Sequence, residues 1–163
     1  MPVTLRDNDI VTNGITATAA ATVVGNWTLQ AGSTWQATYA DLAERYEADA
    51  VYGPGTVLVF GGQKEVTVTS IKADIRKAGV VSTNPAYILN ATAGNDDTHP
   101  LIALKGRVPC KVVGHVKKGD ILVTSSVPGF AECGNDTDNA RAVIGISLTD
   151  KDTDGEGVIE IAV

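Results

Sequence analysis

Three carboxylates at alternate positions near the C-terminus form the strongest metal-like pattern in the chain. The pattern consists of Asp150, Asp152, Asp154 and Gly155, and it matches the first half of a calcium-binding loop. The twelfth position of such a loop needs a bidentate glutamate, but this chain has Ile161 there. A polar turn that closes a hairpin between 142–148 and 157–163 explains the same residues, and we favour that turn over a Ca²⁺ site.

A second group of carboxylates, in segment 39–50, could do acid–base chemistry if burial raised the pKa of one of them. Its members are Asp41, Glu44, Glu47 and Asp49. Apolar residues of the same segment recur at i, i+3, i+4 and i+7, from Tyr39 to Tyr46, which is typical of one face of a helix. We therefore predict a short helix over 39–50, with the acidic residues on its solvent-exposed face.

Two histidines and two cysteines complete the set of reactive side chains, namely His99, His115, Cys110 and Cys133. None stands in a CxxC, HExxH or GxSxG pattern, and no glycine-rich phosphate motif accompanies them. A Ser-His-Asp or Cys-His site that forms only in space is the alternative. We expect neither a cofactor nor a metabolic enzyme. The cysteines are interpreted as small apolar strand residues, with a disulfide between them as the alternative.

Composition and charge narrow the class of protein. The 163 residues include 17 glycines, only two Phe and two Trp, and many Val, Ile, Thr and Ala, a mixture typical of short strands joined by tight turns. A net charge of −6 offers nucleic acid no cationic surface. The chain shows neither a signal-peptide pattern nor an apolar run long enough for a membrane helix. We expect a soluble protein made in a cytoplasm, without nucleic-acid or membrane partners.

The elements that must position these side chains are mainly strands. Residues 15–23 alternate with strand periodicity, but their alanines and threonines bury too little surface to fold without a partner surface. From Thr56 to Val163, short apolar runs alternate with turn residues, which predicts a barrel or sandwich. We divide the chain into an N-terminal assembly segment, 1–38, and a β-module, 39–163. The predicted fold class is mainly β, with one short helix.

Five blocks of this module occur in an ordered series. They are YADLAERYEADAVYGPGTVLVFGG, AGVVSTNPAYIL, IALKGRVPCKVVGHVKKGDILVTSSVPGFA, RAVIGISL and GVIEIAV. The series is similar to the terminal module of tail-fibre and other virion structural proteins of tailed phages, notably those of cyanobacterial hosts, and it covers about three quarters of the chain. The resemblance implies a β-barrel-like module that assembles as a homotrimer, with the N-terminal strands intertwined.

The same resemblance implies a place in a phage particle. We expect a trimeric tail fibre or appendage protein on the external surface of the virion, in contact with tail or baseplate proteins. A capsid decoration protein is the alternative. The series also resembles, more weakly, the autoprocessing chaperone modules at the ends of phage appendages. Acidic residues support self-cleavage in those modules, and the resemblance would give that role to Asp41 and Glu44.

Aromatic side chains are the candidates for contact with a host surface glycan, because flat rings stack on sugars. The candidates are Trp35, Tyr52, Tyr87 and Phe130. We favour a packing role for all four, and glycan binding is the alternative for a module that attaches to a host.

Overall fold

The computed structural model describes residues 26, 28, 31–34, 36–135 and 138–163. The chain divides into two units, Met1–Gln36 and Ala37–Val163. The predicted strand at 15–23 and the candidate Trp35 lie outside the described residues. The architecture below is therefore that of the second unit alone.

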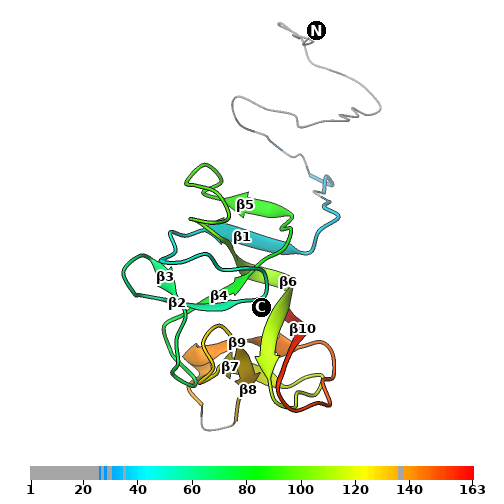
Figure 1. Ribbon diagram of the computed structural model, residues 1–163. Coiled ribbons are helices and arrows are strands. Elements are labelled where there is room, and N and C mark those ends of the chain that lie inside the picture. Colours follow the sequence, from blue (N-terminus) through cyan, green and yellow to red (C-terminus); the bar gives the residue numbers. More distant parts are fainter. Residues whose placement is uncertain (1–25, 27, 29–30, 35, 136–137) are drawn as a thin grey trace, which may run out of the picture. The chain divides into compact units, whose positions relative to one another are not determined.

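The second unit is mainly β, as predicted (Figure 1). Its described residues form ten strands and one 3₁₀ turn, η1 (Ala140–Ala142). The strands are β1 (Asp41–Arg45), β2 (Val57–Phe60), β3 (Val66–Thr67), β4 (Lys77–Val81), β5 (Tyr87–Leu89), β6 (Leu101–Val113), β7 (Ile121–Thr124), β8 (Ala131–Cys133), β9 (Val143–Ser147) and β10 (Glu156–Ala162). No helix of the described residues is long and apolar enough to cross a membrane.

Five strands close into a small barrel in the order β6-β8-β7-β9-β10, and β10 pairs again with β6. The second half of β6 shows why this closure is stable. Val108, Cys110 and Val112 are buried, while the residues between them are more exposed. This alternation sends every second side chain into the barrel, where it meets Ile159 and Ile161 of β10. The predicted hairpin between the last two strands is confirmed by the antiparallel pairing of β9 and β10.

The first half of β6 belongs to a second, open sheet. Its strand order is β5-β1-β6-β4-β2-β3. A separate apolar cluster of Leu58, Val66, Val81 and Ile102 packs on this sheet. Tyr46 adds an edge-to-face contact with Phe60, with ring centroids 5.3 Å apart. The long strand β6 is thus shared by the open sheet and the barrel. Figure 1 shows it passing from beside β1 into the barrel.

Gly106 lies where β6 leaves the open sheet and enters the barrel. Its φ of 127° is reached without strain only by glycine. A Cβ there would lie 2.2 Å from the carbonyl oxygen of Ala40 and 2.6 Å from the Cα of Asp41. Gly106 pairs with Asp41 in register and exchanges both backbone hydrogen bonds with Val163. The start of β1 and the end of the chain therefore meet at this single residue.

The prediction of a helix over 39–50 is wrong. Residues 41–45 form β1, which pairs on one side with β5 and on the other with β6. Asp41 and Ala43 are buried at alternate positions, which is the period of a strand. A helix of this length needs packing on one face, whereas two neighbouring strands satisfy the backbone of this segment on both edges. Tertiary pairing therefore overrides the helical spacing of the apolar residues.

A buried carboxylate holds the loop between β3 and β4. Asp74 accepts hydrogen bonds from the backbone and guanidinium of Arg76 and from the hydroxyl of Thr69. The backbone N–H of Asp74 donates to Thr124 in the barrel, 2.7 Å away. The hydrogen bonds and charge of Arg76 lower the pKa of Asp74 to about 2, from 3.8. The ionised carboxylate thus holds the loop together, and the backbone N–H of the same residue ties the loop to β7.

We expect Asp74→Asn to lower the free energy of unfolding at pH 7 by about 1–2 kcal/mol, because the charged hydrogen bonds to Arg76 are lost. The native pKa lies below the unfolded value, so this contribution is complete above pH 3.8 and disappears as the pH falls toward 2. Denaturant unfolding at both ends of that window measures it. Asp97→Asn, on an exposed carboxylate, is the control, and an equal loss in both variants would contradict the assignment.

Candidate functional site

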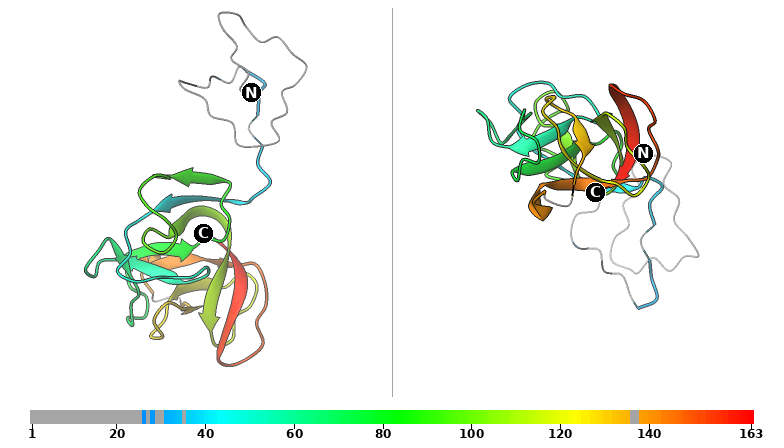
Figure 2. Two further views of the ribbon diagram at one scale, coloured as in Figure 1. Left: turned by 45° about the horizontal axis from the view of Figure 1, so that its top comes forward. Right: turned by 90° about the horizontal axis from the view of Figure 1, so that it is seen from below.

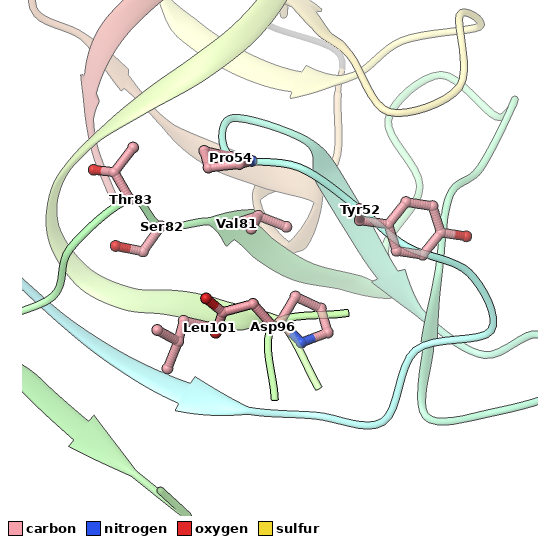
Figure 3. A pocket seen from close by; sticks show the side chains of 8 residues that line it. Tyr52, Pro54, Val81, Ser82, Thr83, Asp96 and Leu101 are labelled. Carbon is pink, nitrogen blue, oxygen red and sulfur yellow. The ribbon is translucent and has the colours of Figure 1, made fainter. Parts of the chain in front are cut away.

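A cavity of about 70 Å³ opens where β4 ends and β6 begins. Such a volume holds several water molecules, since one needs roughly 10–15 Å³. Its lining comes from three segments far apart in sequence: Tyr52, Pro54, Val81, Ser82, Thr83, Asp96, Pro100 and Leu101. Figure 3 shows Ser82 and Thr83 following Val81 on one side, with Asp96 and Leu101 across from them.

Ser82 is the most buried polar group of this cavity, at 5% exposure. Its backbone N–H donates to the carbonyl of Leu101 at 2.7 Å, which fixes its position across from β6. Its hydroxyl has no hydrogen-bond partner among the described residues. The hydroxyl oxygen is enclosed by protein atoms, and a buried hydroxyl without a partner costs stability in this part of the fold.

The polar wall opposite Ser82 is an ion pair. The guanidinium of Arg45 donates to Asp96 at 2.9 Å and to the carbonyl of His99 at 2.6 Å. The Arg45 side chain is 13% exposed, whereas Asp96 is 79% exposed and can reach a ligand. The Nε of Arg45 is buried and, within the described part of the chain, has no acceptor. Arg45 thus holds the Asp96 carboxylate at the cavity and neutralises its charge.

Apolar groups complete the cavity. Val81 and Leu101 are buried, and Pro54 and Pro100 add two rings. Among the described glycan candidates, Tyr52 lines this cavity. Its hydroxyl donates to Asp49 at 2.6 Å, and burial together with this hydrogen bond raises the pKa of Tyr52. The cavity therefore combines apolar surface with a few polar groups, as small-molecule sites do.

The other two described aromatic candidates, Tyr87 and Phe130, lie at separate places. Tyr87 lies on the exposed edge strand β5. Phe130 lines a separate open hollow with Lys111 and Val158. Ser82 was not predicted from the sequence, because a single serine outside any motif does not indicate a site. Asp96 lies in the longest polar loop, which is the one feature of the sequence that could have drawn attention to it.

The weak calcium candidate does hold a cation, but that cation is a lysine of the same loop. Lys151 is buried, and its ammonium donates to the carbonyls of Gly114, Thr153 and Gly155 at 2.7–2.9 Å. Gly157 leaves room for the lysine stem, because a Cβ there would lie 2.5 Å from its Cε. The carbonyl oxygens that a metal could use are therefore already occupied.

The three aspartates of this loop face three different partners. Asp150 accepts from the backbone N–H of Lys118, Asp152 pairs with Lys117, and Asp154 pairs with His115. Across residues 36–135 and 138–163 no group of three or more His, Cys, Asp or Glu side chains could hold a metal ion. The loop thus behaves as a polar turn.

Two of the reactive residues line one open hollow. His115 and Cys133 line the same open hollow, together with Glu132. Cys110 is buried, and both cysteines are free thiols in strands. Burial and the hydrogen bond to Asp120 raise the pKa of Cys133, which is the opposite of what a nucleophilic cysteine requires. This hollow therefore has no activated thiolate.

Asp41 and Glu44, the residues to which the resemblance gives self-cleavage, lie on opposite faces of β1. Side chains three residues apart in a strand point to opposite faces. The pairing of β1 with β5 has no bulge from Leu42 to Glu44, so this alternation holds here. Asp41 is buried, and one of its carboxylate oxygens lacks a partner among the described residues. Glu44 instead accepts a hydrogen bond from Tyr46. The two carboxylates therefore do not form a pair within one chain.

The fold has solved counterparts in a bacteriophage. No protein-family model and no curated protein matches the chain. The C-terminal fragment of bacteriophage phi29 gene product 12 aligns over 76% of this chain and 99% of the fragment, at 15% identity and a TM-score of 0.53. The pre-mature form of gene product 12 aligns over 85% of this chain but only 23% of its own length, at 16% identity and a TM-score of 0.54. The chain is thus similar in fold to part of a phage protein, and this likeness does not specify a cyanobacterial host.

We expect Lys151→Met to lower the free energy of unfolding by about 1–3 kcal/mol, because three backbone carbonyls lose the ammonium that donates to them. Lys118→Met, at an exposed lysine nearby, is expected to change it by less than about 0.5 kcal/mol. Calcium added to the unmodified protein is expected to leave its melting temperature unchanged. A melting temperature that rises with calcium would contradict this account.

Proposed function

We propose that the chain is a structural component of a bacteriophage particle, a tail fibre or appendage protein that assembles as a homotrimer. The observation that carries this proposal is the alignment with nearly the whole C-terminal fragment of phi29 gene product 12. The closed barrel and the free edge of the open sheet support it, because the barrel is complete in one chain and the edge is not.

The free edge is β5, and a second copy is the partner that we propose for it. β5 pairs only with β1 among the described strands, and Figure 2 shows it at the outer edge of the second unit. Tyr87, Ile88 and Leu89 are 50%, 40% and 40% exposed, so apolar side chains lie bare on both of its faces. A short strand with a free edge and two uncovered apolar faces is unfavourable in water. A strand from a neighbouring copy would cover all three surfaces.

A second candidate function is self-cleavage, as in the autoprocessing modules that the sequence resembles. The observation that favours it is the buried Asp41 carboxylate with an unpartnered oxygen. Beside it, the carbonyl of Ala40 accepts the backbone N–H of Arg107 at 3.2 Å, which polarises the peptide bond before Asp41. Because Glu44 lies on the other face of β1, a pair of carboxylates would need a second copy.

Trimer formation is tested by light scattering of the purified full chain, for which we expect three times the 16.9 kDa chain mass. Ile88→Lys should shift the protein to the monomer, because a charge at the middle of β5 would be buried without a partner. Val158→Lys, on an exposed strand residue of the barrel, is the matched control and should remain trimeric. A monomeric unmodified chain would contradict the proposal.

The position on the particle is a separate measurement. Gold labelling of purified virions with an antibody against residues 37–163 should mark the tail in electron micrographs. Label on the head would replace the fibre with a capsid decoration protein, and absence from the virion would contradict a structural role.

Self-cleavage is tested by the intact mass of the purified protein. We expect a fragment that begins at Asp41 to accumulate with time in the unmodified chain and to be absent in Asp41→Asn. The control Asp97→Asn should be cleaved as the unmodified chain is. A single species at the full 16.9 kDa throughout storage would remove this second function while leaving the structural one intact.

A further inference from the structure

We infer that Tyr87 of each copy inserts the tip of its ring into the cavity beside Pro54 and Asp96 of the next copy, and that this contact joins the trimer. The inference rests on the proposed homotrimer and names the surface of the neighbouring copy that β5 meets. Three observations carry it: an exposed tyrosine on a free edge strand, an apolar cavity close by, and a carboxylate at that cavity that Arg45 neutralises.

The symmetry of a trimer decides what kind of surface can meet β5. Two β5 strands that paired with each other would be related by a two-fold axis, and such a contact closes at a dimer. In a three-fold ring each copy contributes two different patches to every contact. The side chains of β5 therefore need a complementary surface elsewhere on the same chain.

Tyr87 is the most exposed side chain of β5. Half of its surface is accessible, and its hydroxyl has no hydrogen-bond partner among the described residues. The backbone of β5 is already held, because Tyr87 pairs in register with Leu42 of β1. A tyrosine buries a large apolar ring at a small cost in side-chain entropy and keeps a polar tip, which suits it to anchor an interface.

The lining and the size of the cavity suit the outer part of an aromatic ring. Val81 and Leu101 are buried, and Pro54 and Pro100 add two apolar rings to the wall (Figure 3). A closed apolar cavity of roughly 150 Å³ holds a whole benzene ring. The present cavity of about 70 Å³ therefore takes the tip of a phenol ring, and the remainder of the ring lies on the residues around the opening.

The carboxylate of Asp96 suits the hydroxyl of the entering ring. The Asp96 side chain is 79% exposed, and the guanidinium of Arg45, 2.9 Å away, neutralises its charge. A phenol donates to this carboxylate without displacing the guanidinium, because a carboxylate accepts several hydrogen bonds. Tyr52, which also lines the cavity, already donates to the carboxylate of Asp49 in this way at 2.6 Å.

The cavity and Tyr87 lie near each other on one chain without meeting. Residues 84–86 alone separate Thr83, which lines the cavity, from Tyr87, which does not. The last residue of β5, Leu89, pairs with Glu44, the neighbour of Arg45 in β1. Rotation about a three-fold axis beside these two patches brings the tyrosine of one copy to the cavity of the next, so that each copy gives one ring and receives one.

Crosslinking between two coexpressed full chains tests the contact directly. One chain carries Tyr87→Cys and the other Thr83→Cys, both in a Cys133→Ser background, because Cys110 is buried and Cys133 is not. We expect a short bis-maleimide to join the two chains into a species of twice the 16.9 kDa chain mass on a denaturing gel. The control pair Tyr87→Cys and Val158→Cys should remain unlinked. Linkage of Tyr87→Cys chains to each other in place of Thr83→Cys would indicate a two-fold contact and overturn the inference.

Dissociation of the trimer on dilution, followed by sedimentation, tests the hydrogen bond between the two copies. Tyr87→Phe and Asp96→Ala should each raise the concentration at which half of the trimer dissociates by about tenfold. The double variant should show much less than the product of the two factors, because both changes remove the same hydrogen bond. The controls Tyr39→Phe and Asp97→Ala, at exposed positions outside the cavity, should dissociate as the unmodified chain does.

The outcomes separate this inference from the proposed function. A trimer in which Tyr87→Cys and Thr83→Cys do not crosslink, or in which the effects of Tyr87→Phe and Asp96→Ala multiply, would overturn the contact and leave the assembly standing. A monomeric unmodified chain would overturn both.

Discussion

The structure depends on the close approach of three backbone segments at Gly106. Any side chain there would collide with the carbonyl of Ala40 and the backbone of Asp41, and the backbone conformation itself favours glycine. Because this contact is possible, β6 can serve two sheets in succession, with β1 beside its first half and β10 beside its second. The barrel core and the open-sheet core are thus joined through one continuous strand.

The same strand, β6, also positions the candidate site. Leu101 begins β6, lies opposite Arg45 in β1, and accepts the backbone hydrogen bond of Ser82 just after β4. The hydroxyl and the ion pair are therefore positioned by three paired strands. Sites built on strands hold their side chains more accurately than sites built on loops. Asp96 comes from the loop between β5 and β6, and Arg45 of β1 fixes it.

Local patterns predicted the fold class but not the site. The antiparallel pairing of the last two strands was predicted correctly, although the loop between them is bonded to Gly114 and Val116 and is not a two-residue Asp-Gly turn. Segment 39–50 was predicted wrongly as a helix, because its periodicity says nothing about the two strands that pair with it. Arg45 and Asp96 lie 51 residues apart, so their pairing exists only in the folded chain. Lys151 shows the same limit, since an acidic loop cannot reveal that its cation is its own lysine.

In the described part of the second unit, the free strand edge and most of the unpartnered buried polar atoms lie at β1 and β5. The barrel closes on itself and fills its interior with apolar side chains. By contrast, β1 carries two of the three buried polar atoms that lack a partner among the described residues, and its neighbour β5 has the free edge. A free edge and unpartnered buried groups both cost free energy in an isolated chain. A second copy paired with β5, as proposed above, would lower these costs.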